Sequence, residues 1–269
     1  PQKDLLPLCA CDLSKDGFED MIAKEAGVKK EDILSYDLFL YNRMRGTTLG
    51  INEEFVAAPK LDDLECAYSS IEGMLNAKLS KDYVTVCAVF DNEEVGSGTK
   101  QGAKSTFLFD VLWRTNQALG YSEEDFYRAL AGSFLLSCDN AHAVHPNYRQ
   151  KTDTTNCTYM NEGIVVKSHA GQKYTSDAVS IAVFKMICEK AGVPVQFFAN
   201  RSDEAGGSTL GNLAMAQVSM NTVDIGLPQL GMHSAYETAG VKDVDSMIRA
   251  IQEFYQTHIK ANADGNYIL

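Results

Sequence analysis

Short apolar runs rich in β-branched residues alternate along the chain with longer stretches whose apolar residues recur every three or four positions. The first pattern is typical of buried strands, and the second is typical of helices that bury one face. The predicted strands cover residues 33–41, 84–90, 163–168, 193–199 and 222–225. The predicted helices cover residues 18–25, 62–77, 105–119, 123–137, 176–191, 208–216 and 244–258. This alternation predicts an α/β fold with a mixed, largely parallel sheet and helices on both faces.

Length and composition favour one domain over residues 1–269. With 269 residues and 45% apolar content the chain is able to bury a full hydrophobic core, and its 6 prolines form no linker. The formal net charge of −12 would repel a phosphate backbone, which argues against nucleic acid as a partner. Because no apolar run is long enough to cross a bilayer, we expect no membrane association. The 7 cysteines follow no zinc-finger spacing and indicate reduced thiols in the cytoplasm.

Two adjacent glutamates, Glu93 and Glu94, directly follow the predicted strand over residues 84–90, in the string DNEEVGSG. Carboxylates at the end of a buried strand are costly unless a cation compensates their charge. Adjacent side chains diverge, so one glutamate is able to bind a metal while the other acts as a base on water. A solvated loop is the plainer alternative. The glycines of the string do not match a dinucleotide site, because acidic residues stand where a pyrophosphate requires backbone amides.

Three further segments place carboxylate or imidazole groups next to predicted elements, where the sites of α/β proteins form. Asp62 begins a predicted helix, Asp139 and His142 lie in the string DNAHAVHPNY, and His233 follows the last predicted strand. Together with Glu94, the carboxylates of Asp62 and Asp139 and the imidazole of His233 are the ligand mix expected for two Zn²⁺ or similar ions about 3.5–4 Å apart. The alternatives are that Asp62 is a helix cap and His233 a hydrogen-bonded polar residue.

The strings PKLDDL, DNEEVGSG, DNAHAVHPNY, GSTLG and MHSAYE resemble, in the same order, motifs of the aspartyl aminopeptidases. The resemblance runs from about residue 31 to about residue 255, and DNAHAVHPNY distinguishes this family from the tetrahedral and glutamyl aminopeptidases. It implies a zinc-peptidase-like fold that holds two divalent metal ions. It also implies that Asp62 bridges both ions, Glu94 and Asp139 bind separate ions, His233 is a terminal ligand and Glu93 is the general base. Zn²⁺ is the leading candidate, with Mn²⁺ and Co²⁺ as alternatives.

The resemblance further implies a reaction and a substrate. A water activated at the metals would give its proton to Glu93 and attack the N-terminal peptide bond of a peptide substrate. Lys167 matches the basic residue that, in acid-preferring members of the family, faces the side chain of an N-terminal Asp or Glu. His142 is a second candidate for substrate binding. Taken without the family, Lys167 reads as a surface lysine at the end of a strand.

The N-terminal part of the chain departs from the family's pattern. Family members carry a further histidine ligand and an inserted dimerisation domain before the segment that residues 33–62 resemble, whereas none of the 5 histidines here precedes Asp62. We therefore interpret the chain as the C-terminal part of a catalytic domain, or as a protein that binds its second ion poorly. The family forms dodecamers, so we expect a homo-oligomer in the full-length form. Two alternatives stay open: a tetrahedral or glutamyl type of aminopeptidase, and a non-catalytic remnant that binds peptides or supports assembly.

Overall fold

The computed structural model describes residues 3–12, 14–204, 206–262 and 265–269. The chain divides into two compact units, Pro1–Tyr41 and Asn42–Leu269. None of the helices in the described ranges is both long and apolar enough to cross a membrane. A single catalytic domain over residues 1–269 stays a prediction.

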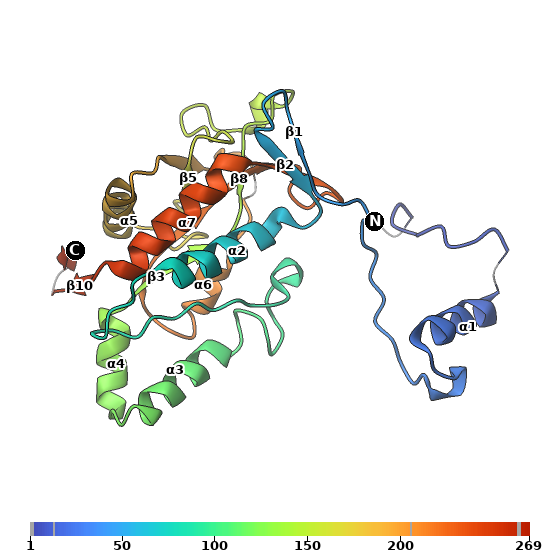
Figure 1. The fold of residues 1–269 in the computed structure, drawn as a ribbon, viewed down its shortest axis with the longest axis horizontal. Helices are drawn as coiled ribbons and strands as arrows, with labels where there is room; N and C mark the ends of the chain where they lie inside the picture. Colours follow the sequence, from blue (N-terminus) through green and yellow to red (C-terminus); the bar gives the residue numbers. More distant parts are fainter. Residues whose placement is uncertain (1–2, 13, 205, 263–264) are drawn as a thin grey trace. The chain divides into compact units, whose positions relative to one another are not determined.

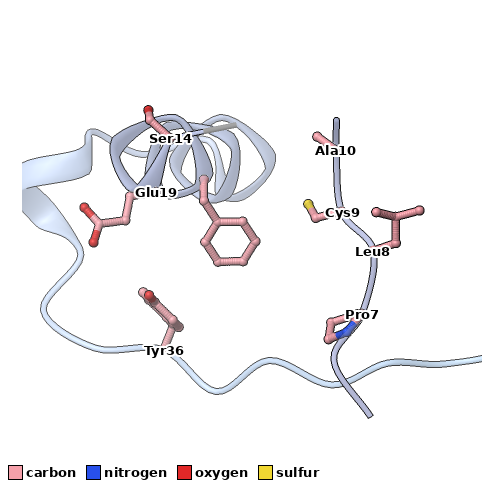
Figure 2. A pocket seen from close by; sticks show the side chains of 8 residues that line it. Pro7, Leu8, Cys9, Ala10, Ser14, Glu19 and Tyr36 are labelled. Carbon is pink, nitrogen blue, oxygen red and sulfur yellow. The ribbon is translucent and has the colours of Figure 1, made fainter. Parts of the chain in front are cut away.

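The first unit contains helix α1 (Lys15–Ala26) and a 3₁₀ turn, η1 (Lys30–Asp32). Ser14 starts α1, because its side chain accepts a hydrogen bond from a backbone N–H of the first turn. Gly27 ends the helix with a φ of 69°, a left-handed conformation that glycine adopts without steric cost. A pocket beside α1, shown in Figure 2, is lined by Pro7, Leu8, Cys9, Ala10, Ser14, Phe18, Glu19 and Tyr36.

The strand predicted over residues 33–41 is wrong. Beyond η1 this segment is irregular, and the side chain of Phe39 is 85% exposed. A strand needs a neighbour that satisfies its backbone N–H and C=O groups, and no strand of the described chain pairs with these residues. The apolar pattern alone therefore did not produce a strand.

The second unit contains a four-stranded sheet with the strand order β3-β7-β5-β6. Its strands are β3 (Phe134–Cys138), β7 (Asn221–Gly226), β5 (Ile164–Ser168) and β6 (Val195–Ala199). β3 is parallel to β7 and β5 is parallel to β6, while β5 and β7 are antiparallel. The mixed, largely parallel sheet that the sequence predicts is confirmed here. β5 and β7 are buried along nearly their whole length, so both faces of these two strands are covered.

A five-stranded, mostly antiparallel sheet has the order β1-β2-β9-β8-β4. Its strands are β1 (Thr47–Leu49), β2 (Phe55–Ala58), β9 (Glu237–Gly240), β8 (Pro228–Leu230) and β4 (Ala141–His142), and a separate ladder joins β10 (Lys260–Ala261) to β11 (Tyr267–Ile268). Two stretches of chain pass from the four-stranded sheet into this one, from β3 to β4 and from β7 to β8. Asp139 and Asn140 therefore lie at the junction of the two sheets.

Helices cover both faces of the four-stranded sheet, as the sequence predicts. The helices that pack on it are α2 (Leu61–Asn76), α5 (Ala178–Ala191), α6 (Leu210–Ala214) and α7 (Val241–Gln256), and Figure 1 shows α2 and α7 side by side. Side chains of α2, α5 and α7 meet Val223 and Ile225 of β7 in the main hydrophobic core. Gly211 of α6 instead approaches Asp224. Because successive strand residues point to opposite faces, α6 lies on the face away from that core.

Two more predicted elements differ from the structure. The helix predicted over residues 123–137 ends as α4 (Glu123–Gly132), because the apolar residues that follow form β3. The strand predicted over residues 84–90 is wrong, since no described strand pairs with the segment and Val84 is 60% exposed. α3 (Phe107–Ala118) and the remaining predicted elements are present with bounds shifted by a few residues.

Candidate metal centre

Asp62 lies where β2 leads into α2. The N-cap of α2 is Lys60, which has the left-handed φ of 61°, so Asp62 is not the helix cap that the sequence left as an alternative. Asp62 and Asp63 have non-helical backbone angles and are joined by a cis peptide bond. Only 5% of the Asp62 side chain is exposed. The carboxylate is thus held inside the protein, just beyond the end of β2.

Glu93 and Glu94 lie in a single 3₁₀ turn, η2 (Glu93–Val95). Asn92 before the turn and Gly96 after it both have positive φ, of 60° and 95°, and the N–H of Gly96 donates to the carbonyl of Glu93 at 2.8 Å. A loop closed in this way fixes the backbone that carries both carboxylates, and glycine accepts its conformation without strain. Glu93 is half-buried and Glu94 is exposed.

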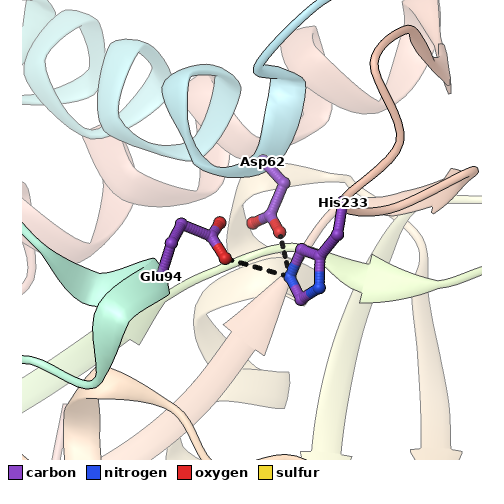
Figure 3. A group of neighbouring side chains, drawn as sticks. All are labelled: Asp62, Glu94 and His233. Carbon is purple, nitrogen blue, oxygen red and sulfur yellow. Dashed lines mark ion pairs between the residues drawn. The ribbon is translucent and has the colours of Figure 1, made fainter. Parts of the chain in front are cut away.

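Asp62, Glu94 and His233 converge on one point, as Figure 3 shows. The Nε2 atom of His233 lies 3.1 Å from Oδ2 of Asp62 and 3.1 Å from Oε2 of Glu94. One ligand atom from each residue lies within 4.8 Å of the other two. Two carboxylate oxygens and an imidazole nitrogen at this spacing are able to hold one divalent ion.

Asp62 also belongs to a second group, with Asp63 and Asp139, in which one oxygen from each residue lies within 4.8 Å of the others. The Oδ1 atom of Asp63 is buried and makes no hydrogen bond within the described residues. Sequence reasoning treated Asp63 only as the neighbour of Asp62, although the paired Asp in PKLDDL was a signal for it. Both groups contain Asp62, and a carboxylate is able to bridge two ions when it belongs to the ligand sets of both.

Lys167 is buried, with 2% of its surface exposed, so the alternative of a surface lysine is wrong. Its Nζ donates to the carbonyl oxygens of Asp139 and Asn140, both at 3.0 Å, and lies 3.5 Å from Oδ2 of Asp139. Burial acts to lower the pKa of Lys167, but the negative charges of Asp139 and Asp224 outweigh burial and raise the pKa above its usual value. The second group therefore has a permanent cation beside it. Contact of Lys167 with a substrate stays a prediction.

Crowding of carboxylates changes how the site titrates. Burial, together with the charges of Asp139 and Glu94, raises the pKa of Asp62 to about 8. Burial and the same two neighbours also raise the pKa of Glu93. Without a compensating cation, burial and these neighbours therefore favour the protonated form of Asp62. A divalent ion among these groups would favour their ionised forms instead.

His142 lies on β4, and its ring centroid is 6.3 Å from that of Phe198 on β6. Partial burial of the ring and the nearby charge of Lys167 lower the pKa of His142. Neither of the two ligand groups found among the described residues includes it. A role of His142 in substrate binding stays a prediction.

A buried network around Asn140 supports the strand junction next to Asp139. The amide Nδ2 of Asn140 donates to Oε1 of Glu65 and to Oε1 of Gln229, both at 2.7 Å, and its Oδ1 accepts from the Cys66 thiol at 2.9 Å. Burial raises the pKa of Glu65 to about 8. Sequence reasoning missed this network, because the partners of Asn140 lie 74 to 89 residues away along the chain.

The sequence of this chain is similar to those of known proteins. The family model described as Aminopeptidase I zinc metalloprotease (M18) matches residues 12–255. The probable M18 family aminopeptidase 2 of Clostridium acetobutylicum is 46% identical over 261 residues, which cover 95% of this chain and 60% of that protein.

Solved structures agree with the family match. A chain of the cryo-EM structure of the Ape4 and Nbr1 complex superposes with a TM-score of 0.82 and 32% identity, covering 95% of this chain and 50% of that one. A chain of the S. cerevisiae mApe1 dodecamer gives a TM-score of 0.75 and 29% identity over 88% of this chain and 54% of that one. The zinc-peptidase-like fold expected from the sequence is confirmed. The present chain spans 50% to 60% of the length of these three proteins.

Proposed function

Because the chain belongs to the M18 family of zinc aminopeptidases, we propose that it carries the metal site of an enzyme that hydrolyses the N-terminal peptide bond of peptides. The observation that carries this function is the sharing of Asp62 between two ligand groups. In this proposal Asp62 bridges two divalent ions, Glu94 and His233 bind one ion, and Asp139 binds the other. Zn²⁺ is the first candidate because the family is described as zinc metalloproteases, and Mn²⁺ and Co²⁺ suit the same donors.

The residues fit divalent cations in three respects. Carboxylate oxygens and an imidazole nitrogen are donors that Zn²⁺ prefers. Burial and the negative charges of Asp139 and Glu94 raise the pKa of Asp62, and a bound cation would oppose both effects. The buried Oδ1 of Asp63 has no hydrogen-bond partner within the described residues and is available as a further donor.

Divalent ions, when bound, supply Lewis acidity and lower the pKa of a water molecule. The proton transfers fall to Glu93, because burial and the charges of Asp139 and Glu94 raise its pKa and make it a better proton acceptor. Glu93 takes one proton from the attacking water as the water oxygen bonds to the carbonyl carbon. It then passes that proton to the leaving amine as the C–N bond breaks.

The proposal extends to substrates whose N-terminal residue is acidic. Lys167 is a buried cation beside Asp139, and its attraction for an Asp or Glu side chain supports this preference. His142 lies on β4, three residues after Asp139, and this closeness to the proposed ions supports a contact between His142 and the substrate. Lys167 would then be shared between Asp139 and the substrate carboxylate.

Assembly and location are further parts of the proposal. The mApe1 protein of S. cerevisiae forms a dodecamer, which supports a homo-oligomer for the full-length form of this protein. The 7 free thiols support a location in the cytoplasm. A non-catalytic peptide-binding protein is the second candidate, because the group of Asp62, Asp63 and Asp139 contains no imidazole ligand among the described residues.

Metal content and turnover test the enzyme proposal together. We expect about two ions per chain by elemental analysis and faster hydrolysis of an aspartyl than of a leucyl p-nitroanilide. Glu93→Gln should lower kcat by about 10²- to 10⁴-fold while the ions stay bound, whereas Glu189→Gln, an exposed glutamate on α5, should change neither. Full activity after removal of all metal would refute the proposal. Bound ions without turnover would favour the non-catalytic candidate.

A further inference from the structure

One buried carboxylate joins the two chain segments that carry Asp62 and His233. Glu237 is the first residue of β9 and is 2% exposed. Its Oε2 accepts a hydrogen bond from the backbone N–H of Asp62 at 2.9 Å, and its Oε1 accepts one from the backbone N–H of His233 at 2.8 Å. Each oxygen of Glu237 is therefore committed to the backbone of a different residue in the Asp62–Glu94–His233 group.

The sheet explains how Glu237 reaches both segments. β9 pairs with β2 in a register that sets Glu237 opposite Ala58, four residues before Asp62 along the chain. The turn that enters β9 carries His233, four residues before Glu237. The side chain of Glu237 thus points to the place where the segment after β2 and the turn before β9 meet.

The side chains of this group need such an anchor. His233 has 65% of its side chain exposed and Glu94 has 51%, so neighbouring atoms do little to fix either of them. His233 also has a φ of 65°, a left-handed conformation that costs a non-glycine residue energy and persists only when its surroundings hold it. The hydrogen bond from the His233 N–H to Glu237 stabilises this backbone conformation directly.

We propose that Glu237 is a positioning residue that sets the separation of Asp62 and His233 for the ion they share. The inference rests on the proposed function for the presence of that ion. The two hydrogen bonds from the Asp62 and His233 N–H groups to Glu237, which we call the clamp, exist in the metal-free protein. Glu237 acts through backbone N–H groups and leaves the ligand atoms of both side chains available. Carboxylates that orient metal ligands in this indirect way typically change metal affinity by about 10- to 100-fold when they are replaced.

Asp243 provides a matched control within the same unit. It is 1% exposed, lies in the first turn of α7, and also accepts hydrogen bonds from two backbone N–H groups, those of Asn161 at 2.5 Å and Gly163 at 2.8 Å. It belongs to neither ligand group of the described residues. Asp243→Asn and Glu237→Gln therefore remove the same kind of interaction, but only Glu237→Gln affects the ligand segments.

Two measurements on the full 269-residue chain test the inference. In the metal-free protein, Glu237→Gln should raise the hydrogen-exchange rates of the Asp62 and His233 amides by about tenfold. Glutamine has only one side-chain oxygen to accept from the two backbone N–H groups, so their hydrogen bonds are weakened. Competition with a chromophoric chelator should show Zn²⁺ and Co²⁺ binding weakened by about 10- to 100-fold. Asp243→Asn should increase exchange at Asn161 and Gly163 and leave metal affinity within about threefold of the wild type.

The outcomes separate the two proposals. A Glu237→Gln protein with wild-type metal affinity, or an Asp243→Asn protein that loses as much affinity as Glu237→Gln, would overturn the positioning role. Unchanged exchange at Asp62 and His233 in Glu237→Gln would overturn the clamp itself. A wild-type chain that binds no divalent ion would overturn the proposed function, and the role of Glu237 towards the ion with it, whatever the exchange data show.

Discussion

Glu65 should make the protein less stable as the pH rises. Burial is the main cause that raises the pKa of Glu65 from 4.5 to about 8. Its Oε2 atom also has no hydrogen-bond partner within the described residues. The folded state therefore binds this proton more tightly than the unfolded state does. Stability from Glu65 is complete below about pH 4.5 and is lost as the pH rises through about 8. The shift of about 3.5 pH units corresponds to about 5 kcal/mol, a large part of the unfolding free energy of a typical domain.

Urea unfolding of the wild type and of Glu65→Gln, in EDTA between about pH 5 and pH 8, measures this effect. Glutamine has the shape of the neutral acid and cannot ionise. The wild type should lose about 3 to 4 kcal/mol relative to the variant over that range, and other titrating groups cancel in the difference. If the two proteins lose stability in parallel, Glu65 is already ionised in the folded state at low pH and the reasoning is refuted.

Two further predictions concern the charges of the site. Lys167→Met should lower the unfolding free energy by about 3–5 kcal/mol, because it leaves Asp139 without its buried cation. Chemical denaturation measures this loss, and an equal loss when the exposed Lys190 is changed to Met would contradict the prediction. Removing metal with EDTA should lower Tm and Zn²⁺ should restore it, since an ion at about 1,000 times its Kd stabilises by about 4 kcal/mol. In scanning calorimetry the Zn²⁺-dependent rise should vanish in Asp62→Ala, and a rise of full size there would place the ion elsewhere.

Local pattern predicted β5, β6 and β7, which pair with one another in the four-stranded sheet. β5 and β7 carry β-branched residues such as Val165, Val166 and Val223, are buried on both faces, and were both predicted from the sequence. Residues 84–90 show a similar run but lack a partner strand in the described chain, and strand formation depends on pairing as much as on side chains. The apolar residues of β3 continue the helical spacing of α4, so periodicity placed them in the wrong element.

The sequence predicted the candidate ligands, which are unusual in type and position, but it did not predict the residues that support them. Adjacent acids and a histidine at the ends of elements drew attention to Asp62, Glu94 and His233, which the structure brings together. Glu237, which bonds the backbone of Asp62, and Asn140, which supports the junction next to Asp139, are common residue types whose partners lie 175 and 75 residues away. Only the register of β9 on β2 and the meeting of the two sheets reveal them.

The junction between the sheets explains why a lysine and an acidic ligand are buried together. Where the chain leaves β3 and enters β4, the N–H groups of Asp139 and Ala141 still donate to the carbonyls of Ile225 and Leu227. The carbonyls of Asp139 and Asn140 instead accept from Lys167. A buried ammonium needs negative charge nearby, and Asp139 supplies it from the same residue whose carbonyl the ammonium satisfies. Lys167 thus satisfies the two carbonyls that the break in the ladder leaves free, and the Asp139 carboxylate balances the charge of Lys167. The same carboxylate lies beside Asp62, where the proposed ions would bind.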